Sequence, residues 1–313
     1  MRRPPTALLP RRQALIRMLA ASCAAGLATG MRALAQEPEA PALGPAKPSA
    51  KGTSAKPWET LPPTPQWPKP DRSGIVPANG ARLFYAQFGK GPNVLLLHGG
   101  MGSSNYWGHL IDALSPRCTV TALDTRGQGR CPFVPGAFSY KLLADDAAAA
   151  LAALNVPSAA VVGWSDGAIA ALQMAISHPA KVTRAFVFGG NITVDGYKAN
   201  GNSSPVFAAY SRRCRAEYQE LSPNPEKWSS LVRALGPMWR SEPGISRPQL
   251  AALKIPVTIC DGQFDEIIKR EHTEMMARSI PGAKLQILPE VSHFAMLQKP
   301  DAFNRAVLEF VAA

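Results

Sequence analysis

Residues 163–167 read Gly-Trp-Ser-Asp-Gly, and this short segment is the strongest single indication of the fold. It closes the continuous apolar run Ala159–Gly163, which is typical of a strand buried on both faces, and it opens the helical pattern Asp166–His178. A serine on so sharp a turn has strained backbone angles, and flanking glycines let strand and helix approach closely. This context predicts a nucleophilic serine at Ser165. The alternative is an ordinary helix start that Ser165 or Asp166 caps.

Short apolar runs alternate with amphipathic segments on both sides of this turn. The apolar runs predict further strands at Arg82–Phe88, Val94–Leu97, Thr119–Asp124, Val182–Phe188, Val257–Cys260 and Lys284–Leu288. The amphipathic segments predict helices at Tyr140–Leu154, Glu271–Ile280 and Pro300–Ala313. This alternation indicates an α/β fold with a mostly parallel central sheet flanked by helices. Residues 192–253 break the pattern and predict a small helical insertion, with a short helix at Trp228–Leu235.

A serine hydroxyl needs a base to remove its proton, and a carboxylate must hold that base. His293 follows the last predicted strand, and in folds with this type of turn the base lies on that loop. The acid is expected after Val257–Cys260, where Asp265 is the first choice and Asp261 the alternative. Glu266 is interpreted as a solvated surface residue. The remaining histidines lie in other contexts: His98, His109, His178 and His272.

Charge that develops on a carbonyl oxygen needs preorganised donors, usually two backbone N–H groups. Asp166, directly after the serine, is predicted to supply one of them. The glycine-rich turn at residues 99–102 follows a predicted strand and is expected to supply the other at Gly100. Glycine-rich loops also bind phosphate, but no nucleotide-binding signature accompanies this one. The predicted chemistry therefore requires no cofactor and no metal.

The first 35 residues are predicted to be an export signal. Basic residues precede a weakly apolar, Ala-rich run at Ala14–Met31, and residues 33–35 read Ala-Leu-Ala, which is the layout of a secretory signal. The pair Arg11 and Arg12 is typical of the twin-arginine route. A periplasmic or secreted protein is therefore expected, without stable membrane insertion after cleavage. Three alternatives remain open: a retained anchor, a lipoprotein site at Cys23 and an organellar transit peptide.

Residues 36–72 contain mostly Pro, Ala, Lys and Ser, and they predict a flexible linker before a catalytic domain at residues 73–313. Four cysteines follow the predicted signal. Two of them fall on predicted buried strands, where cysteine acts as a small apolar residue. Cys131 with Cys214 is therefore the one disulfide to consider, although the spacing does not demand it. No His/Cys cluster has the spacing of a metal site.

The charge balance does not indicate a nucleic-acid partner. The chain has 34 basic and 22 acidic residues, a formal charge of +12. Half of this surplus belongs to six arginines in the first 35 residues, which contain no acid. The rest is scattered, without a dense basic run interleaved with aromatics. A small-molecule, ester-like substrate is the expected partner, and the sequence leaves the oligomeric state open.

Taken together, these motifs resemble the α/β-hydrolase superfamily, in its branch of small serine esterases and C–C hydrolases. The resemblance covers about Gly74 to the C-terminus and rests on five ordered segments: His98-Gly99-Gly100, Asp124-Thr125-Arg126-Gly127-Gln128-Gly129, the turn at Ser165, Gly262-Gln263-Phe264-Asp265 and Ser292-His293-Phe294. The second segment departs from the pattern of the branch, which continues to a serine where this chain has Cys131.

This resemblance implies a structural role for Asp124 and a cap over the substrate pocket at residues 192–253. Trp228, Met238 and Trp239 are then expected either in the pocket wall or in the core of the cap. The expected reaction is hydrolysis of an ester or lactone through an acyl-enzyme. A C–C hydrolase or a perhydrolase would use the same triad, and a non-catalytic ligand-binding protein on this scaffold is the alternative of another class.

Overall fold

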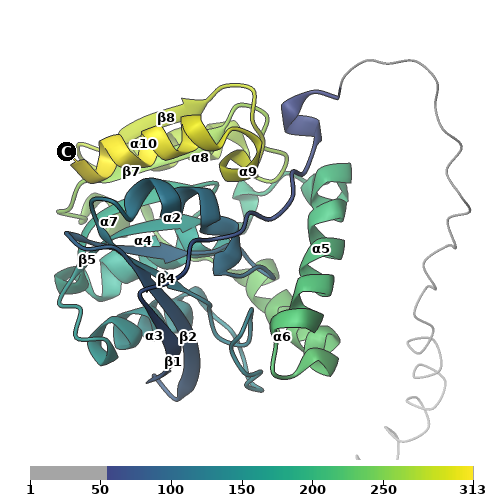
Figure 1. The fold of residues 1–313 in the computed structure, drawn as a ribbon. Coiled ribbons are helices and arrows are strands. Elements are labelled where there is room, and N and C mark those ends of the chain that lie inside the picture. The colour runs from purple at the N-terminus through teal and green to yellow at the C-terminus, as the bar shows by residue number, and fades with distance from the viewer. Residues whose placement is uncertain (1–54, 313) are drawn as a thin grey trace, which may run out of the picture. The chain divides into compact units, whose positions relative to one another are not determined.

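An eight-stranded sheet forms the centre of residues 55–312, which are the residues that the computed structural model describes (Figure 1). Its strands are β1 (Arg72–Ala78), β2 (Ala81–Phe88), β3 (Asn93–Leu97), β4 (Thr119–Leu123), β5 (Ala159–Trp164), β6 (Val182–Phe188), β7 (Val257–Gly262) and β8 (Lys284–Leu288). Their order in the sheet is β1-β2-β4-β3-β5-β6-β7-β8. The pairs β1–β2 and β2–β4 are antiparallel, and the other pairs are parallel. The predicted α/β class is confirmed.

Helices cover this sheet. They are α2 (Gly108–Leu114), α3 (Tyr140–Ala153), α4 (Asp166–Ser177), α8 (Arg270–Ser279), α9 (Ala295–Gln298) and α10 (Pro300–Ala312). α2 packs against α10, and α3 packs against α4. Every residue of β5 is buried, as expected for a central parallel strand with helices on both faces. β1 was not predicted, because Gly74 and Pro77 interrupt its pattern; an edge strand tolerates both residues.

The parallel arrangement explains where the predicted site residues meet. The carboxyl ends of neighbouring parallel strands lie at the same edge of a sheet, and ligands bind in the crevice there. The loop that begins at Gly99 follows β3, and Ser165 follows β5. Asp265 and His293 follow β7 and β8. Segments that are far apart in the chain are thereby brought to one edge.

The stretch between β6 and β7 is helical. It contains η4 (Val194–Gly196), η5 (Gly201–Ser203), α5 (Pro205–Leu221), η6 (Pro225–Lys227), α6 (Trp228–Ser241) and α7 (Arg247–Ala251). Figure 1 shows α5 and α6 standing together beside the sheet. α5 is longer than the short helical patterns expected there. Ser204 caps its N-terminus by accepting a hydrogen bond from the N–H of Phe207, and Pro205 occupies its first position.

The turn after β4 is built around two ion pairs whose aspartates are buried. Asp124 accepts hydrogen bonds from the N–H and hydroxyl of Ser104, and it pairs with Arg130 at 3.1 Å. Arg126 pairs with Asp146 on α3. Asp124 therefore organises its turn, as the resemblance implies. The cysteines of residues 55–312 are free, so Cys131 and Cys214 do not form a disulfide.

Residues 55–71, the C-terminal part of the predicted linker, belong to the same folded unit as the sheet. Leu61 and Trp67 pack against the core, and the ring of Trp58 stacks on Phe264 with centroids 4.1 Å apart. The guanidinium of Arg213 on α5 donates to the carbonyls of Leu61 and Pro62. The prediction of a flexible linker over residues 36–72 was therefore wrong for residues 55–71, because two tryptophans and a leucine anchor that segment. Residues 1–54 lie outside the described residues.

Removal of this anchored segment should destabilise the domain. A chain that starts at Ala55 retains the stacking of Trp58 and the burial of Trp67, whereas a chain that starts at Asp71 loses both. Loss of these partly buried side chains should lower the midpoint of thermal unfolding by on the order of 5 °C or more. Differential scanning calorimetry of the two chains measures this difference. Equal midpoints would show that the segment contributes nothing to stability.

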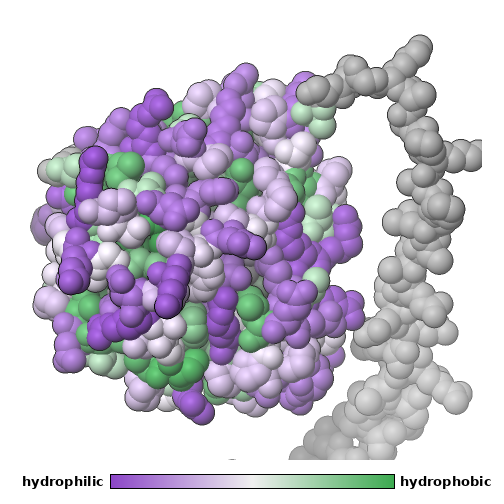
Figure 2. Space-filling view, viewed as in Figure 1, coloured by the Kyte–Doolittle hydropathy of each residue, from purple (hydrophilic) through white to green (hydrophobic). Residues whose placement is uncertain are grey.

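The surface seen in Figure 2 contains both hydrophilic and apolar side chains. Figure 2 shows hydrophilic side chains over most of this face, with small separate apolar patches between them. Within residues 55–312, none of the helices combines the length and the hydropathy that a transmembrane span requires. The predicted export signal lies outside the described residues.

Candidate active site

Ser165 lies at the sharp turn between β5 and α4. Its φ of 55° is in the left-handed region, which costs a non-glycine residue about 1–3 kcal/mol. The glycines on either side explain why the turn can form. A Cβ on Gly163 would collide with the main-chain oxygen of Gly167, and a Cβ on Gly167 would collide with that of Leu97. The strand and the helix are thus close enough to hold the half-buried Ser165 at the edge of the sheet.

His293 and Asp265 form a buried pair next to this turn. Nδ1 of His293 lies 2.6 Å from Oδ2 of Asp265, and both side chains are almost fully buried. The other oxygen of Asp265, Oδ1, accepts hydrogen bonds from the N–H groups of Ile267 and Ile268, at 2.7 and 2.8 Å. The carboxylate is therefore fixed on one side by its own loop and on the other by the imidazole.

Charge and burial act in opposite directions on this pair. Burial by itself would raise the pKa of Asp265, but the neighbouring His293 and its hydrogen bond lower that pKa to about 2. Burial would likewise lower the pKa of His293, but the charge and hydrogen bond of Asp265 act together with the charges of Glu266 and Asp166, and their sum raises it. Nε2 of His293 has no hydrogen-bond partner among residues 55–312. This ring nitrogen is free to receive a proton.

Asp261, the alternative acid, does not contact the histidine. Its Oδ1 accepts from the N–H of Gly262, and its Oδ2 accepts from the hydroxyl of Thr273 at 2.6 Å. Burial, followed by the charge of Asp265, raises its pKa well above the usual range. A carboxyl group that favours its neutral form is poorly suited to support an imidazolium. The geometry therefore favours Asp265.

Glu266 is not the solvated surface residue that its sequence context suggested. Its Oε2 accepts a hydrogen bond from the backbone N–H of His293 at 3.1 Å. Its Oε1 is shielded from solvent and has no hydrogen-bond partner among residues 55–312. The physical reason is the proximity of the two loops, because a Cβ on Gly262 would lie 2.5 Å from the carbonyl oxygen of Ser292. The carboxylate of Glu266 therefore lies against the loop of His293, and the residue is only partly exposed.

The glycine-rich loop after β3 lies beside Ser165. A Cβ on Gly99 would lie 3.2 Å from Cβ of Ser165, so this loop can approach the serine only because it lacks side chains. The carbonyl of Gly100 accepts from the hydroxyl of Tyr210 at 2.7 Å, while no hydrogen bond from its N–H is found within residues 55–312. Asp166 is the first residue of α4, where an N–H has no partner within the helix. Both predicted donors are thus available to a ligand.

The side chain of Asp166 is buried in a network of its own. Its two oxygens accept hydrogen bonds from the hydroxyl of Tyr140 and from the indole N–H of Trp239, each at 2.8 Å. Burial raises the pKa of this carboxyl group, although both hydrogen bonds oppose the shift. Because Trp239 lies on α6, this network links the turn at Ser165 to the helical insertion.

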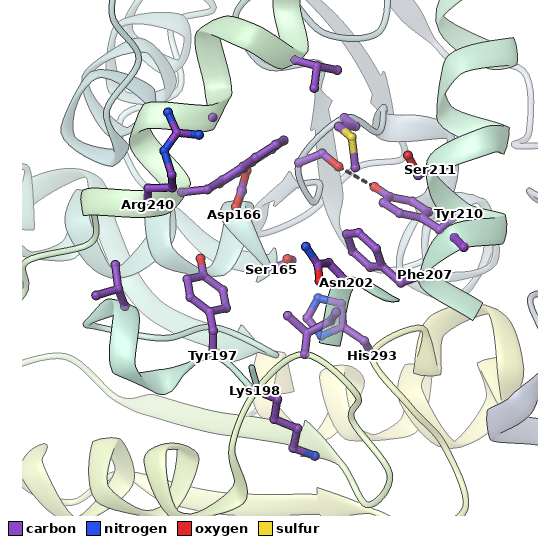
Figure 3. Close-up of a pocket in the computed structure, with 18 of the residues that line it drawn as sticks. Ser165, Asp166, Tyr197, Lys198, Asn202, Phe207, Tyr210, Ser211, Arg240 and His293 are labelled. Carbon is purple, nitrogen blue, oxygen red and sulfur yellow. Dashed lines mark hydrogen bonds between the residues drawn. The ribbon is translucent and has the colours of Figure 1, made fainter. Parts of the chain in front are cut away.

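A cavity of about 930 Å³ contains Ser165, His293, Gly100 and Asp166 in its lining. This volume suits a small organic molecule. Figure 3 shows Ser165 and His293 near its centre, with Phe207 and Tyr210 of α5 on one side. The insertion contributes most of the remaining wall, from η4 to α6.

The three pocket candidates from the insertion differ in their positions. Trp239 lines the cavity, whereas Met238 is buried in the core and Trp228 packs against Tyr218. Tyr210 was not identified from the sequence, although it lines the cavity and binds the Gly100 carbonyl. The sequence did contain a signal for the burial of Tyr210, because apolar and aromatic residues of α5 recur at every fourth position: Val206, Tyr210, Cys214 and Tyr218.

Comparison with known proteins agrees with this geometry. Residues 94–306 match the model of the alpha/beta hydrolase family, and this match spans more than half of the chain. The chain belongs to the alpha/beta hydrolase family. The matched region begins within β3 and ends within α10, so it includes the turn at Ser165, the helical insertion and the loops of Asp265 and His293.

Known proteins resemble this chain over about three quarters of its length. The serine hydrolase BPHL of Mus musculus is 28% identical over 254 residues, which cover 76% of this chain and 86% of that protein. Two solved structures are similar in fold. The meta-cleavage product hydrolase CumD of Pseudomonas fluorescens IP01 has a TM-score of 0.66 at 22% identity, covering 77% of this chain and 97% of CumD. The carboxylesterase CesB of Bacillus subtilis has a TM-score of 0.64 at 21% identity, covering 78% and 92%.

Proposed function

We propose that this member of the family is a serine hydrolase that cleaves a carboxylic ester or lactone of a small molecule through an acyl-enzyme. One observation carries the proposal. The strained Ser165 and a histidine that is held by a buried carboxylate line the same cavity. This combination of nucleophile, base and orienting acid is the arrangement that acyl transfer requires.

The first half-reaction forms a bond between Oγ of Ser165 and the carbonyl carbon, while Nε2 of His293 accepts the serine proton. The N–H groups of Gly100 and Asp166 would stabilise the negative oxygen of the tetrahedral intermediate. The intermediate then collapses, the bond to the alcohol oxygen breaks, and His293 returns its proton to that oxygen. Asp265 stabilises the imidazolium between these two transfers.

The second half-reaction repeats these steps with water in place of the serine hydroxyl. His293 accepts a proton from water, and the oxygen attacks the acyl carbon. Collapse of the second intermediate releases the acid and restores the Ser165 hydroxyl. Each step uses only side chains and backbone groups of the site.

The relatives support this proposal at the level of hydrolysis. They include a carboxylesterase, a meta-cleavage product hydrolase and a serine hydrolase. Apolar and aromatic side chains from the insertion line the cavity alongside polar ones. A partly apolar, small-molecule ester is therefore the proposed substrate class.

We also propose that the first 35 residues direct export by a twin-arginine-like route to the periplasm or the outside of a bacterial cell. The support is the sequence pattern alone: paired arginines, a weakly apolar run and Ala-Leu-Ala at residues 33–35. Replacement of Arg11 and Arg12 by lysine should then retain the unprocessed chain in the cytoplasm, as measured by fractionation.

The proposed activity can be tested with the chain from Gln36 onward. It is expected to hydrolyse short- and medium-chain p-nitrophenyl esters and to react with a fluorophosphonate probe. Peptide mass spectrometry should locate the probe on Ser165. Labelling without ester turnover would favour a C–C bond substrate or a ligand-binding role. A folded protein that shows neither labelling nor turnover would contradict the proposal.

A further inference from the structure

Two consecutive carboxylates hold the same histidine in this structure. Asp265 binds the imidazole of His293 through Oδ2, at 2.6 Å. The next residue, Glu266, binds the backbone N–H of His293 through Oε2, at 3.1 Å. A hydrogen bond from an N–H to a carboxylate is stronger than one to a neutral acceptor. The histidine is thus fixed at two points, by its ring and by its main chain.

We propose that Glu266 is a positioning residue of the site, whose carboxylate fixes the main chain of His293 and supplies a second negative charge beside the imidazole. This inference rests on the proposed function, because it assigns to Glu266 a part in supporting the base of that reaction. Glu266 itself is absent from the lining of the cavity. It therefore acts through His293 and not on the substrate.

The loops that carry the acid and the base are joined along their length. The N–H of Gln263 donates to the carbonyl of Leu288 at 2.8 Å, and the N–H of Phe264 donates to that of Val291 at 2.9 Å. The N–H of Glu290 donates to the side chain of Gln263 at 3.0 Å. In residues 55–312, the N–H of His293 is bound by the Glu266 side chain and not by a backbone carbonyl. Glu266 therefore completes the connection at the catalytic position.

The second oxygen of Glu266 argues against a purely structural role. Oε1 is buried and lacks a hydrogen-bond partner among residues 55–312. A buried carboxylate oxygen without a partner is costly, so a residue retained only for stability would be expected to bind through both oxygens. What this placement provides is a partly buried charge, which solvent screens less than a surface charge, next to the ring that becomes an imidazolium.

The charged groups around the histidine define the expected effect. Asp265, Glu266 and Asp166 all favour the protonated ring and raise the pKa of His293, against its burial. The ammonium group of Lys198 is bound to the backbone carbonyl of Asp265. Burial, followed by the charge of Asp265, raises the pKa of Glu266, and His293 opposes this shift. Removal of the Glu266 charge should therefore lower the pKa of His293.

The sign of the pH effect follows from the role of the base. Only neutral His293 can accept the serine proton, so the rate falls as the pH drops below the pKa of His293. Glu266→Gln keeps an acceptor for the backbone N–H but removes the charge. The acidic limb of the rate profile should then move to lower pH. Glu266→Ala removes both the acceptor and the charge, and it should also lower the plateau about tenfold.

The rate of fluorophosphonate labelling at Ser165, measured between pH 4 and 9, tests this without knowledge of the substrate. Glu290→Gln is the matched control, because Glu290 lies on the same loop but its side chain is exposed and pairs with Lys299. Glu290→Gln should leave the acidic limb of the pH–rate profile unchanged. An unchanged limb in Glu266→Gln would overturn the inference, and that variant decides the question even if Glu266→Ala fails to fold.

A second readout separates this inference from the proposed function. Titration of the His293 ring by NMR, assigned with His293→Gln, gives its pKa without any reaction. A lower pKa in Glu266→Gln, together with no labelling of the natural chain, would show that the charge coupling exists but that the hydrolase proposal fails. If the natural chain is labelled but the His293 ring has the same pKa in both proteins, the role of Glu266 is contradicted and the proposed function stands.

Discussion

Replacement of Ser165 by alanine is expected to lower kcat for the best p-nitrophenyl ester by roughly 10⁵- to 10⁶-fold. The variant lacks the atom that forms the acyl-enzyme bond, so only binding and the two N–H donors could still accelerate attack by water. These groups alone leave a residual rate enhancement of about 10³- to 10⁴-fold over the uncatalysed reaction. The measurement is steady-state hydrolysis at saturating ester.

The fold should survive this change. Alanine occupies a positive φ at about the same cost as serine, and Oγ of Ser165 makes no hydrogen bond with another of residues 55–312. The free energy of unfolding should therefore change by less than about 0.5 kcal/mol. Ser177→Ala, at the far end of the same helix, is the control and should retain full activity. Substantial turnover by folded Ser165→Ala would place the nucleophile elsewhere.

Asp265→Asn should lower kcat about 10⁴-fold. Oδ2 accepts the proton of His293 Nδ1, and Oδ1 accepts two backbone N–H groups. An amide has a single oxygen, so it must present its NH₂ group to one of these donors. The imidazole then loses either its orientation or the tautomer that leaves Nε2 unprotonated, and the support for the imidazolium charge is lost as well.

Asp261→Asn provides a close comparison, because this aspartate is also buried and lies four residues earlier. Its raised pKa indicates a carboxyl group that tends toward the neutral form, which an amide imitates. Its two partners, the N–H of Gly262 and the hydroxyl of Thr273, can both still be bound. We expect a loss of less than about tenfold. A large loss in Asp261→Asn with a small one in Asp265→Asn would reverse the assignment of the acid.

Much of the fold could be predicted because its signals are local. A continuous apolar run predicts a buried strand, and Gly-x-Ser-x-Gly directly after such a run predicts the turn at Ser165. The strands β2 to β8 and the helices α3, α4, α8 and α10 were expected within a few residues of their observed ends. β1 was missed, because its pattern is weak and its pairing with β2 is what stabilises it.

The parts that sequence reasoning missed depend on contacts between distant residues. The segment at residues 55–71 was interpreted as flexible from its composition, yet Arg213, more than 140 positions later, binds its carbonyls. Glu266 was interpreted as solvated, yet it binds the backbone of a residue on another loop. The spacing in α5 indicates that Tyr210 is buried, but only the packing of this helix against the rest of the domain places Tyr210 over the cavity.

The class of the fold, the order of its elements and the residue types of the candidate site could all be predicted from the amino-acid sequence. These follow from local patterns, because strand and helix periodicities and the steric demands of a tight turn act over a few residues. The three-dimensional packing was needed to show which carboxylate binds His293, that Glu266 lies against the loop of His293, and that the insertion forms much of the cavity wall. Those outcomes depend on distances between loops, and the packing of the sheet and its helices sets these distances.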